Sequence, residues 1–304
     1  MNRREFLKKS LALAAGASAL LLPRSAVRAL GAAVSGPADL AAVRGGEPGE
    51  MFDRGIAAMG GMKRFVSKGQ TVVVKPNMAW DVRPELGANT NPALVERIVR
   101  RCFEAGASKV YVFDHTCDLW KKSYVTSGIE EAARRAGATV VPADQARYYR
   151  KTPIAGARVL TETLVHELVL QSDVFINVPV LKNHGGAGLT IAMKNLMGIV
   201  WNRGELHSRG LHQCIADLSL LRKPDLNVVD AYRVMTRSGP RGTSERDVTI
   251  RKAQVLSTDI VAADTAAAKI FGTEPGSVEY IRQGAALKAG TMDLDRLKVE
   301  RIAL

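Results

Sequence analysis

Short runs of β-branched residues alternate with longer amphipathic stretches along this chain, and this alternation constrains the fold more than any other feature. Strands are expected at residues 71–75, 109–114 and 139–141, and helices at residues 92–105 and 128–136. The first helix has Asn91 at its N-cap, Pro92 at its first position and Gly106 at its C-cap. Because the strands are apolar throughout, both faces of their sheet should be covered. The sequence therefore predicts an α/β fold, a doubly wound and mostly parallel sheet with helices on both faces.

The second half of the chain continues the same pattern. Further strands are expected at residues 174–180, 225–229 and 254–257, and further helices at 190–196, 213–221, 260–271 and 277–287. Residues 143–170 leave room for a small additional lobe. No internal repeat or low-complexity tract follows residue 50. We therefore expect a single domain over residues 51–304, preceded by an Ala-, Gly- and Pro-rich linker at 30–50.

Residues 1–29 resemble a signal peptide of the twin-arginine type. The paired Arg3 and Arg4 precede an apolar stretch at residues 10–22 and a small-residue site at 27–29. The apolar stretch is shorter than the roughly 20 residues that span a bilayer, and an uncleaved membrane anchor is the alternative. The prediction is a periplasmic or extracytoplasmic protein without a stable membrane span after processing, with the twin-arginine export machinery as a partner. Because this pathway exports folded proteins, often with a cofactor inserted, export also suggests a cofactor, whose identity is unknown.

The net charge of +13 permits two interpretations. Six cations and one acid in residues 1–29 account for +5, which leaves +8 for the rest of the chain. No run of five or more cations occurs. The positive charge therefore indicates either a diffusely basic soluble domain or a protein that binds a small anionic ligand. Nucleic-acid binding is disfavoured because the cations are scattered and the signal directs export.

Polar residues follow several of the predicted strands. Lys75 and Asn77 follow the first strand, and Asp114, His115 and Thr116 follow the second. The strand at 174–180 is followed by Lys182, Asn183 and His184, and Asp230 and Asp259 follow the later strands. Ligands of open parallel sheets bind beyond the carboxyl ends of the strands, so these side chains should converge. Burial would lower the pKa of Lys75, which suits a base, a Schiff-base nucleophile or an anion clamp, whereas a lysine reaching solvent is the alternative.

A glycine-rich turn follows the strand expected at residues 174–180 and precedes the helix expected at 190–196. Gly186 and Gly188 lie in this turn, and its backbone N–H groups could form a nest for a phosphate or carboxylate. The turn lacks the glycine spacings of dinucleotide-binding and P-loop proteins. Lys194 and Asn195 on the helix would face the same ligand, and a plain tight turn is the alternative.

Histidines and cysteines give no metal site of the usual spacing. His207, His212 and Cys214 form the one cluster of soft ligands, but the two histidines are spaced i, i+5, whereas a helix favours i, i+4, and Gly210 interrupts them. A single histidine acting as acid or base, His212, is favoured over a metal site. The chain has three cysteines and no C-x-x-C motif, so no metal and no iron–sulfur cluster is expected.

Several short patterns occur together and in order along the chain. They are Val-Lys75-Pro-Asn77, Asn177-Val-Pro-Val-Leu-Lys182 with His184, Met193-Lys194-Asn195-Leu-Met-Gly198, Val229-Asp230-Ala, Gly239-Pro240 with Gly242, and Ser257-Thr-Asp259 through Ala263-Asp264 and Gly272. Over residues 70–290 they resemble the DUF362 family, whose members are largely uncharacterised. Some members carry a ferredoxin-like module with two cysteine clusters, which this chain lacks. The resemblance therefore implies no established reaction.

These observations lead to one functional prediction and one alternative. The prediction is an exported enzyme acting on a small anionic substrate in a cationic pocket, with Lys75, His184 and His212 handling protons. The residues expected to bind the substrate or a cofactor are Asn77, Lys182, Asn183, Gly186, Gly188, Lys194, Asn195, Asp230 and Asp264. Redox chemistry would require a noncovalent cofactor, because the chain offers no cluster ligands. The alternative is a non-catalytic periplasmic protein that carries a ligand or cofactor.

Overall fold

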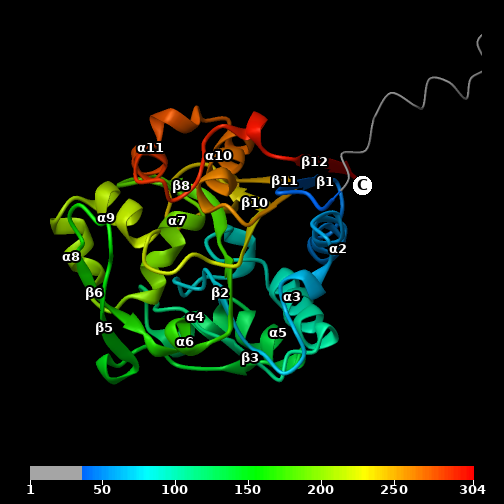
Figure 1. Cartoon of the computed structure of the whole chain (residues 1–304), viewed down its shortest axis with the longest axis horizontal. Helices are drawn as coiled ribbons and strands as arrows, with labels where there is room; N and C mark the ends of the chain where they lie inside the picture. Colours follow the sequence, from blue (N-terminus) through cyan, green and yellow to red (C-terminus); the bar gives the residue numbers. More distant parts are fainter. Residues whose placement is uncertain (1–35) are drawn as a thin grey trace, which may run out of the picture. The chain divides into compact units, whose positions relative to one another are not determined.

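The β-branched runs assemble into one mixed sheet (Figure 1). The computed structural model describes residues 36–304, so the expected signal peptide at 1–29 lies outside the described residues. The strands run in the order β12 (Val299–Ala303), β1 (Leu40–Arg44), β11 (Val248–Ser257), β10 (Leu226–Met235), β7 (Val174–Val178), β2 (Thr71–Pro76), β3 (Lys109–Val112) and β4 (Thr139–Val140), while β8 (Val180–His184) pairs with β10 and β9 (Gly188–Thr190) with β8. All pairs from β10 to β4 are parallel, whereas β11 is antiparallel to both neighbours.

Helices cover both faces of this sheet, which confirms the predicted α/β class. One face packs against α2 (Pro48–Ala58), α3 (Pro92–Ala105), α4 (Trp120–Thr126) and α5 (Ile129–Arg135), and the other against α7 (Ala192–Asn195), α9 (Leu211–Leu218), α10 (Ile260–Phe271) and α11 (Glu279–Ala286) (Figure 1). Successive side chains of a strand point to opposite faces, so Val72 and Val74 enter one core and Val73 the other. Both cores are needed because a parallel sheet is apolar on both faces.

The domain begins earlier than the sequence predicts. Residues 40–44 lie in the expected linker, but they form β1, which pairs with β11 on one side and β12 on the other. Residues 48–50 begin α2, with Pro48 at its first turn. The linker expected at 30–50 is therefore wrong over its second half, because the partners of β1 come from distant parts of the chain.

Pro179 divides the strand that was expected at residues 174–180. Proline has no backbone N–H to donate to a sheet, and the chain continues as β7 before it and β8 after it. The expected helix at 190–196 is also shorter, because Gly188–Thr190 pairs with β8 as β9 and only Ala192–Asn195 is α-helical. In contrast, the helices expected at 92–105 and 260–271 agree with α3 and α10.

Residues 143–170 form a separate hairpin but not a separate lobe. β5 (Tyr149–Pro153) and β6 (Glu162–His166) pair antiparallel, and the short helix α6 (Glu167–Gln171) follows. Tyr149, Leu160 and Val165 are buried in the same core as α7 and α10, so the hairpin extends that core. Between residues 36 and 304, no helix is long and apolar enough to cross a membrane.

Candidate functional site

A cavity of about 450 Å³ lies beyond the carboxyl ends of the parallel strands. Lys75 ends β2 beside it, Asp114 and His115 follow β3, and Lys182 comes from β8. The short helix α7 contributes Lys194 and Asn195, and α8 (Arg203–Ser208) contributes Arg203 and His207. The sheet therefore gathers side chains from segments more than a hundred residues apart, as expected for a ligand site in this fold.

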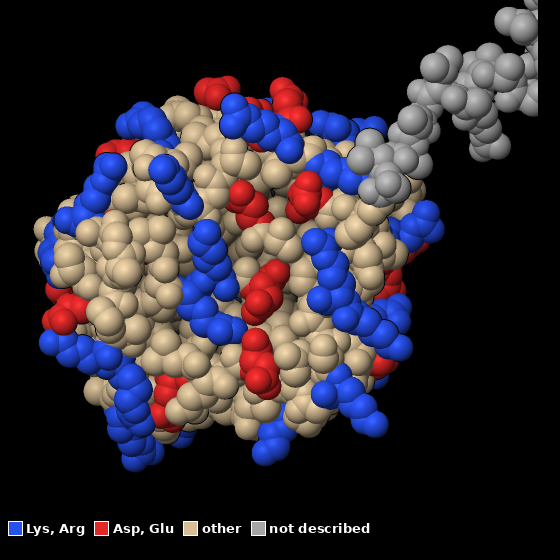
Figure 2. Space-filling view, in the orientation of Figure 1, with Lys and Arg blue, Asp and Glu red and all other residues tan. Residues whose placement is uncertain are grey.

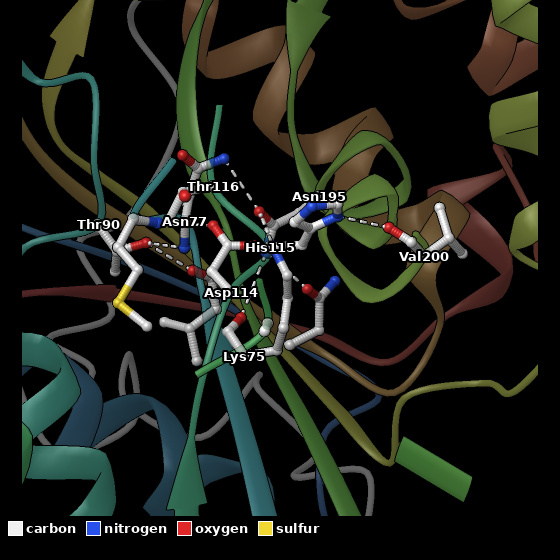
Figure 3. A network of polar contacts seen from close by, with 12 residues as sticks. Lys75, Asn77, Thr90, Asp114, His115, Thr116, Asn195 and Val200 are labelled. Atoms are coloured by element: carbon white, nitrogen blue, oxygen red, sulfur yellow. Dashed lines mark hydrogen bonds and ion pairs between the residues drawn. The ribbon is translucent and has the colours of Figure 1, made fainter. Parts of the chain in front are cut away.

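Lys75 and Asp114 form a buried ion pair on the floor of this cavity (Figure 3). Lys75 Nζ lies 2.8 Å from Asp114 Oδ1 and donates a hydrogen bond of 2.9 Å to Asn195 Oδ1. Burial lowers the pKa of Lys75, and the Asp114 carboxylate opposes this shift. Gly198 packs directly on the pair, because a Cβ atom at this position would lie 1.9 Å from Asp114 Oδ1 and 2.5 Å from Lys75 Nζ.

Buried asparagines hold Lys75 from the other side. Asn227 Nδ2 reaches the Ser257 carbonyl, Asn177 Nδ2 donates to Asn227 Oδ1, Asn195 Nδ2 donates to Asn177 Oδ1, and Asn77 Nδ2 donates to Asn195 Oδ1. A carbonyl oxygen can only accept, so the orientation of the first amide fixes that of every later amide. The chain of amides therefore presents the oxygen of Asn195, and not its NH₂ group, to the Lys75 ammonium.

Positive charge predominates around the cavity. Among the described residues that line it, Lys75, Lys182, Lys194 and Arg203 are cationic and Asp114 is the one carboxylate. Burial lowers the pKa of Lys182 to about 7, helped by the nearby Lys194 ammonium, and burial lowers the pKa of Lys194 to about 8. Lys182 donates to the Ala88 carbonyl, an uncharged partner. The cavity therefore contains more positive charge than its own residues neutralise.

Charge on the outer surface is arranged differently. On the face shown in Figure 2, basic and acidic side chains are interspersed over most of the surface. The net charge of +13 thus does not form one continuous basic patch on this face. An excess of cations inside a cavity attracts a small anion, which can enter the cavity, more strongly than a large one.

The backbone fixes two histidines of the cavity in opposite tautomers. His115 Nδ1 lies 2.8 Å from the Val200 carbonyl, which can only accept, so this nitrogen carries the proton and Nε2 has a free lone pair (Figure 3). His184 Nδ1 accepts from the backbone N–H groups of Gly186 and Ala187, so its proton is on Nε2. Burial lowers the pKa of His115, and burial with the cations of Lys194 and Lys182 lowers the pKa of His184 to about 3. At neutral pH these two rings therefore offer one imidazole acceptor and one imidazole donor, both uncharged.

The sequence of this chain matches a known protein family. The family model described as "Domain of unknown function (DUF362)" matches residues 72–269, which include the cavity. The chain belongs to the DUF362 family. A thylakoid-associated protein of Synechocystis sp. is 26% identical to this DUF362 protein over 237 residues, covering 73% of this chain and 70% of that protein.

Two solved structures are also similar to this DUF362 protein, with lower sequence identity. The lactate racemase apoprotein of Thermoanaerobacterium thermosaccharolyticum has a TM-score of 0.41 and 12% identity, with 72% of this chain and 54% of that chain covered. A protein of Thermotoga maritima has a TM-score of 0.43 and 10% identity, with 79% and 60% covered. This chain thus spans less than two thirds of either protein, and the resemblance has no bearing on its substrate.

Half of the residues predicted to form the pocket line this cavity. They are Lys75, Asn77, Lys182, His184, Lys194 and Asn195. Gly186 and Gly188 do not line it, because the glycine-rich turn is the tip of the β8–β9 hairpin and not a nest before a helix. His184 Nδ1 accepts the backbone N–H of Gly186, so a side chain of the protein occupies the donor expected to bind an anion.

Four other predicted residues have structural partners away from the cavity. Asn183 Oδ1 accepts the Gly239 N–H, and Asp230 accepts the N–H groups of Asn91 and Tyr232, while burial raises the pKa of Asp230 to about 6. Asp264 accepts the first N–H groups of α7, and His212 Nε2 lies 3.8 Å from Glu279 Oε2. Asn183 and Asp230 lie within β8 and β10 and do not follow a strand as predicted, while His212 and Asp264 lie on α9 and α10. All four connect elements.

The sequence reasoning missed several residues of the cavity. Asp114 and His115 follow β3, so the strand-end rule identifies their position, but they were not chosen as site residues. Cys117, Thr190 and Arg203 carry no comparable signal, because a loop, the hairpin and α8 bring them to the cavity. Between residues 36 and 304, no group of three or more His, Cys, Asp or Glu side chains could hold a metal ion.

Proposed function

We propose that this DUF362 protein is an exported enzyme that acts on a small anionic molecule held in the cavity. One observation carries the proposal: four cationic side chains surround the cavity, and its single described carboxylate is already paired with Lys75. A buried charge without a partner is costly, and an anionic ligand would supply the missing charge to Lys182 and Lys194. Lys75 then acts mainly as a fixed cation and Asn195 as its support.

The neutral histidines supply a route for proton transfer on the bound anion. His115 Nε2 can accept a proton from the substrate, and His184 Nε2–H can donate a hydrogen bond to an oxygen on which charge develops. Lys182, with a pKa of about 7, can exchange a proton near neutral pH. In this proposal His115 takes the role first given to His212. A redox reaction would additionally need a noncovalent cofactor.

Binding of sulfate, measured by titration calorimetry, tests the anion site. We expect substitution of Lys182→Met or Lys194→Met to weaken sulfate binding by at least about tenfold, since each removes one charge from a partly dehydrated site. Lys68→Met is the matched control, because Lys68 is exposed and does not line the cavity. Equal affinity in all four proteins would reject the anion site.

The histidines separate an enzyme from a carrier, the second candidate. Both rings are held by the backbone and uncharged, so either could simply hydrogen-bond to a carried ligand. In an enzyme, His115→Gln should reduce turnover of the natural substrate by about 10²- to 10⁴-fold while sulfate affinity changes little. In a carrier, the unmodified protein would show no turnover of its ligand, and His115→Gln, whose amide can still hydrogen-bond, should change ligand affinity little. Fractions of small anions from the exporting host, screened for sulfate competition, would provide the substrate for this assay.

Export is the second part of the proposal and concerns residues outside the described structure. The paired Arg3 and Arg4, the apolar stretch at 10–22 and the small-residue site support it. The Synechocystis relative is named as thylakoid-associated, and this name describes that protein alone. A mature protein beginning near residue 30 in the periplasmic fraction would support export.

A further inference from the structure

One cysteine opens onto the cavity, and the other two do not. Cys117 is exposed and lines the cavity, whereas Cys102 and Cys214 are buried. Burial raises the pKa of both buried thiols, which also makes them slow to react. The chain has three cysteines, so Cys117 is the one thiol that a reagent in solution can reach without unfolding of the protein.

A guanidinium is fixed beside the Cys117 sulfur. Arg203 Nη1 lies 3.2 Å from Cys117 Sγ, and Arg203 Nη2 donates to the carbonyl of Thr116. The Cys117 N–H donates to the Ala79 carbonyl at 2.8 Å, which fixes the backbone that carries the sulfur. A negative charge on this sulfur would raise the pKa of Lys182 and Lys194, so the thiol is within electrostatic reach of these lysines.

Two buried oxygens at the cavity have no partner within the described protein. Thr190 is 3% exposed and Asn77 is 7% exposed, and both line the cavity. Thr190 Oγ1 and Asn77 Oδ1 have no hydrogen-bond partner. A buried polar atom without a partner costs about 1–3 kcal/mol, so these atoms, like the lysines, favour a bound polar ligand beside Cys117.

We propose that Cys117 is a thiol–disulfide exchange site for small anionic disulfides that enter the cavity. The proposal rests on the anion site proposed above and adds a covalent step to it. The Cys117 thiol loses its proton to solvent, and its sulfur attacks one sulfur of the disulfide. The S–S bond of the ligand breaks, a new S–S bond joins one half to Cys117, and the other half leaves as a thiolate with the electron pair. Arg203 and the lysines attract the incoming anion and stabilise the departing one.

Two chromogenic disulfides of different charge test this proposal. 5,5′-Dithiobis(2-nitrobenzoate) is a dianion, and 2,2′-dithiodipyridine is neutral. The ratio of their second-order rate constants on the native protein is compared with the same ratio for N-acetylcysteine amide. Cationic clefts raise association rates of anions by about 10- to 1,000-fold, so we expect the protein's ratio to exceed that of the model thiol by at least about tenfold. This measurement uses the unmodified protein and does not depend on the folding of any variant.

Variants and salt then identify the groups responsible. Arg203→Met and Lys194→Met should lower the ratio towards that of the model thiol, Lys68→Met should leave it unchanged, and Cys117→Ser should abolish the fast reaction. Sodium chloride at about 0.5 M should lower the ratio because it screens exposed charges. Sulfate at the concentration that half-saturates the site should slow the dianion more than the neutral reagent.

Failure of this proposal is distinguishable from failure of the anion site. A ratio equal to that of the model thiol overturns the Cys117 proposal, and sulfate binding to Cys117→Ser with unchanged affinity would then show that the anion site remains. Fast labelling that persists in Cys117→Ser would overturn it as well, because the reaction would then belong to another thiol. If sulfate fails to bind any of the proteins, the anion site is wrong, and the exchange site that rests on it is rejected too.

Discussion

At the scale of single residues, the lysines of the cavity are not equivalent. Lys75 has a carboxylate at 2.8 Å and an amide oxygen at 2.9 Å, so its charge is compensated within the protein. Among residues 36–304, the partner of Lys182 Nζ is a backbone carbonyl, and that of Lys194 Nζ is a thioether sulfur at 3.6 Å. Since Asp114 is already bound to Lys75, the anionic ligand proposed above would supply the negative charge that the other two lysines lack.

Gly198 tests the importance of the Lys75–Asp114 pair. Gly198→Ala would place a Cβ atom on this pair and should separate it, lowering the free energy of unfolding by at least about 2 kcal/mol and reducing sulfate affinity. Denaturant unfolding and calorimetry measure the two effects. Gly185→Ala is the control, because its Cβ would meet nothing within 4 Å and its φ is not positive. Unchanged stability of Gly198→Ala would contradict the proposed close packing.

The pH dependence of anion binding follows from Lys182 and Lys194. Their pKa values of about 7 and about 8 mean that both are charged at low pH and lose their protons as pH rises through this range. Sulfate favours the charged forms and does not titrate here, so its affinity should fall by at least about tenfold between about pH 6 and about pH 9. Binding at pH 8 should take up protons, measured by calorimetry in buffers of different ionisation enthalpy. The Lys182→Met variant should take up fewer protons when it binds sulfate. Binding without proton uptake would argue against the lowered pKa values of Lys182 and Lys194.

Residue chemistry alone identified part of the cavity. Lys75, Asn77 and Lys182 were predictable, because polar residues directly after apolar strands are brought to one edge of a parallel sheet. Asp230 satisfied the same criterion, and Asp264 belonged to the patterns shared with the family, yet each carboxylate accepts backbone N–H groups and connects elements. The sequence does not distinguish these roles, because capping and catalysis use the same side chains.

At the scale of elements, α7 depends on its neighbours for its position. It has four residues, too few for a stable isolated helix, and it carries both Lys194 and Asn195. Asp264 of α10 accepts the N–H groups of Ala192 and Met193 at 2.7 and 3.1 Å, and Asn177 of β7 donates to the Ala192 carbonyl. The cavity is thus shaped by residues that do not line it.

Asp264→Asn tests this dependence. An amide replaces one of the two acceptor oxygens by a donor, so one N–H group of α7 loses its partner at a cost of about 1–3 kcal/mol. We expect lower stability and weaker sulfate binding, because Lys194 and Asn195 are no longer held. Asp259→Asn is the matched control: its Oδ1 can still cap α10 by accepting from Val261 and Ala262, but the Thr291 N–H loses its acceptor, so stability should fall while sulfate affinity stays unchanged. Equal sulfate affinity in Asp264→Asn and the wild type would contradict the role of Asp264.

The elements predicted best are those determined by local signals. α3 and α10 have an N-cap side chain, a C-cap glycine and an amphipathic or uniformly apolar interior, all of which are visible in the sequence. The helix expected at 190–196 failed because residues 188–190 pair with β8, a contact decided by the hairpin and not by helix propensity. The proline itself predicts that the strand at residues 174–180 is divided at Pro179. The consequence, that β10 pairs first with β7 and then with β8, was not predictable from the sequence.

At the scale of the whole described domain, one edge of the sheet combines segments from opposite ends of the described residues. β1, the first strand, pairs with β11 and with β12, which contains some of the last residues of the chain. The cavity likewise combines residues from 75 to 240. Because these contacts are distant in sequence, the sequence predicted the class of the fold but not that residues 40–44 belong to it. The proposed anion site therefore forms only after the segments that contain residues 75 to 240 have been synthesised.

We expect the domain to be exported after it has folded. The twin-arginine pathway was predicted from residues 1–29, and it carries folded proteins, so a fold that requires its C-terminal strand is compatible with it. Arg3→Lys combined with Arg4→Lys should keep the protein in the cytoplasm, folded and able to bind sulfate with unchanged affinity. Immunoblots of fractionated host cells and calorimetry of the retained protein measure both effects. Lys8→Arg with Lys9→Arg preserves the charge and should be exported normally, whereas efficient export of the double-lysine variant would point to another route.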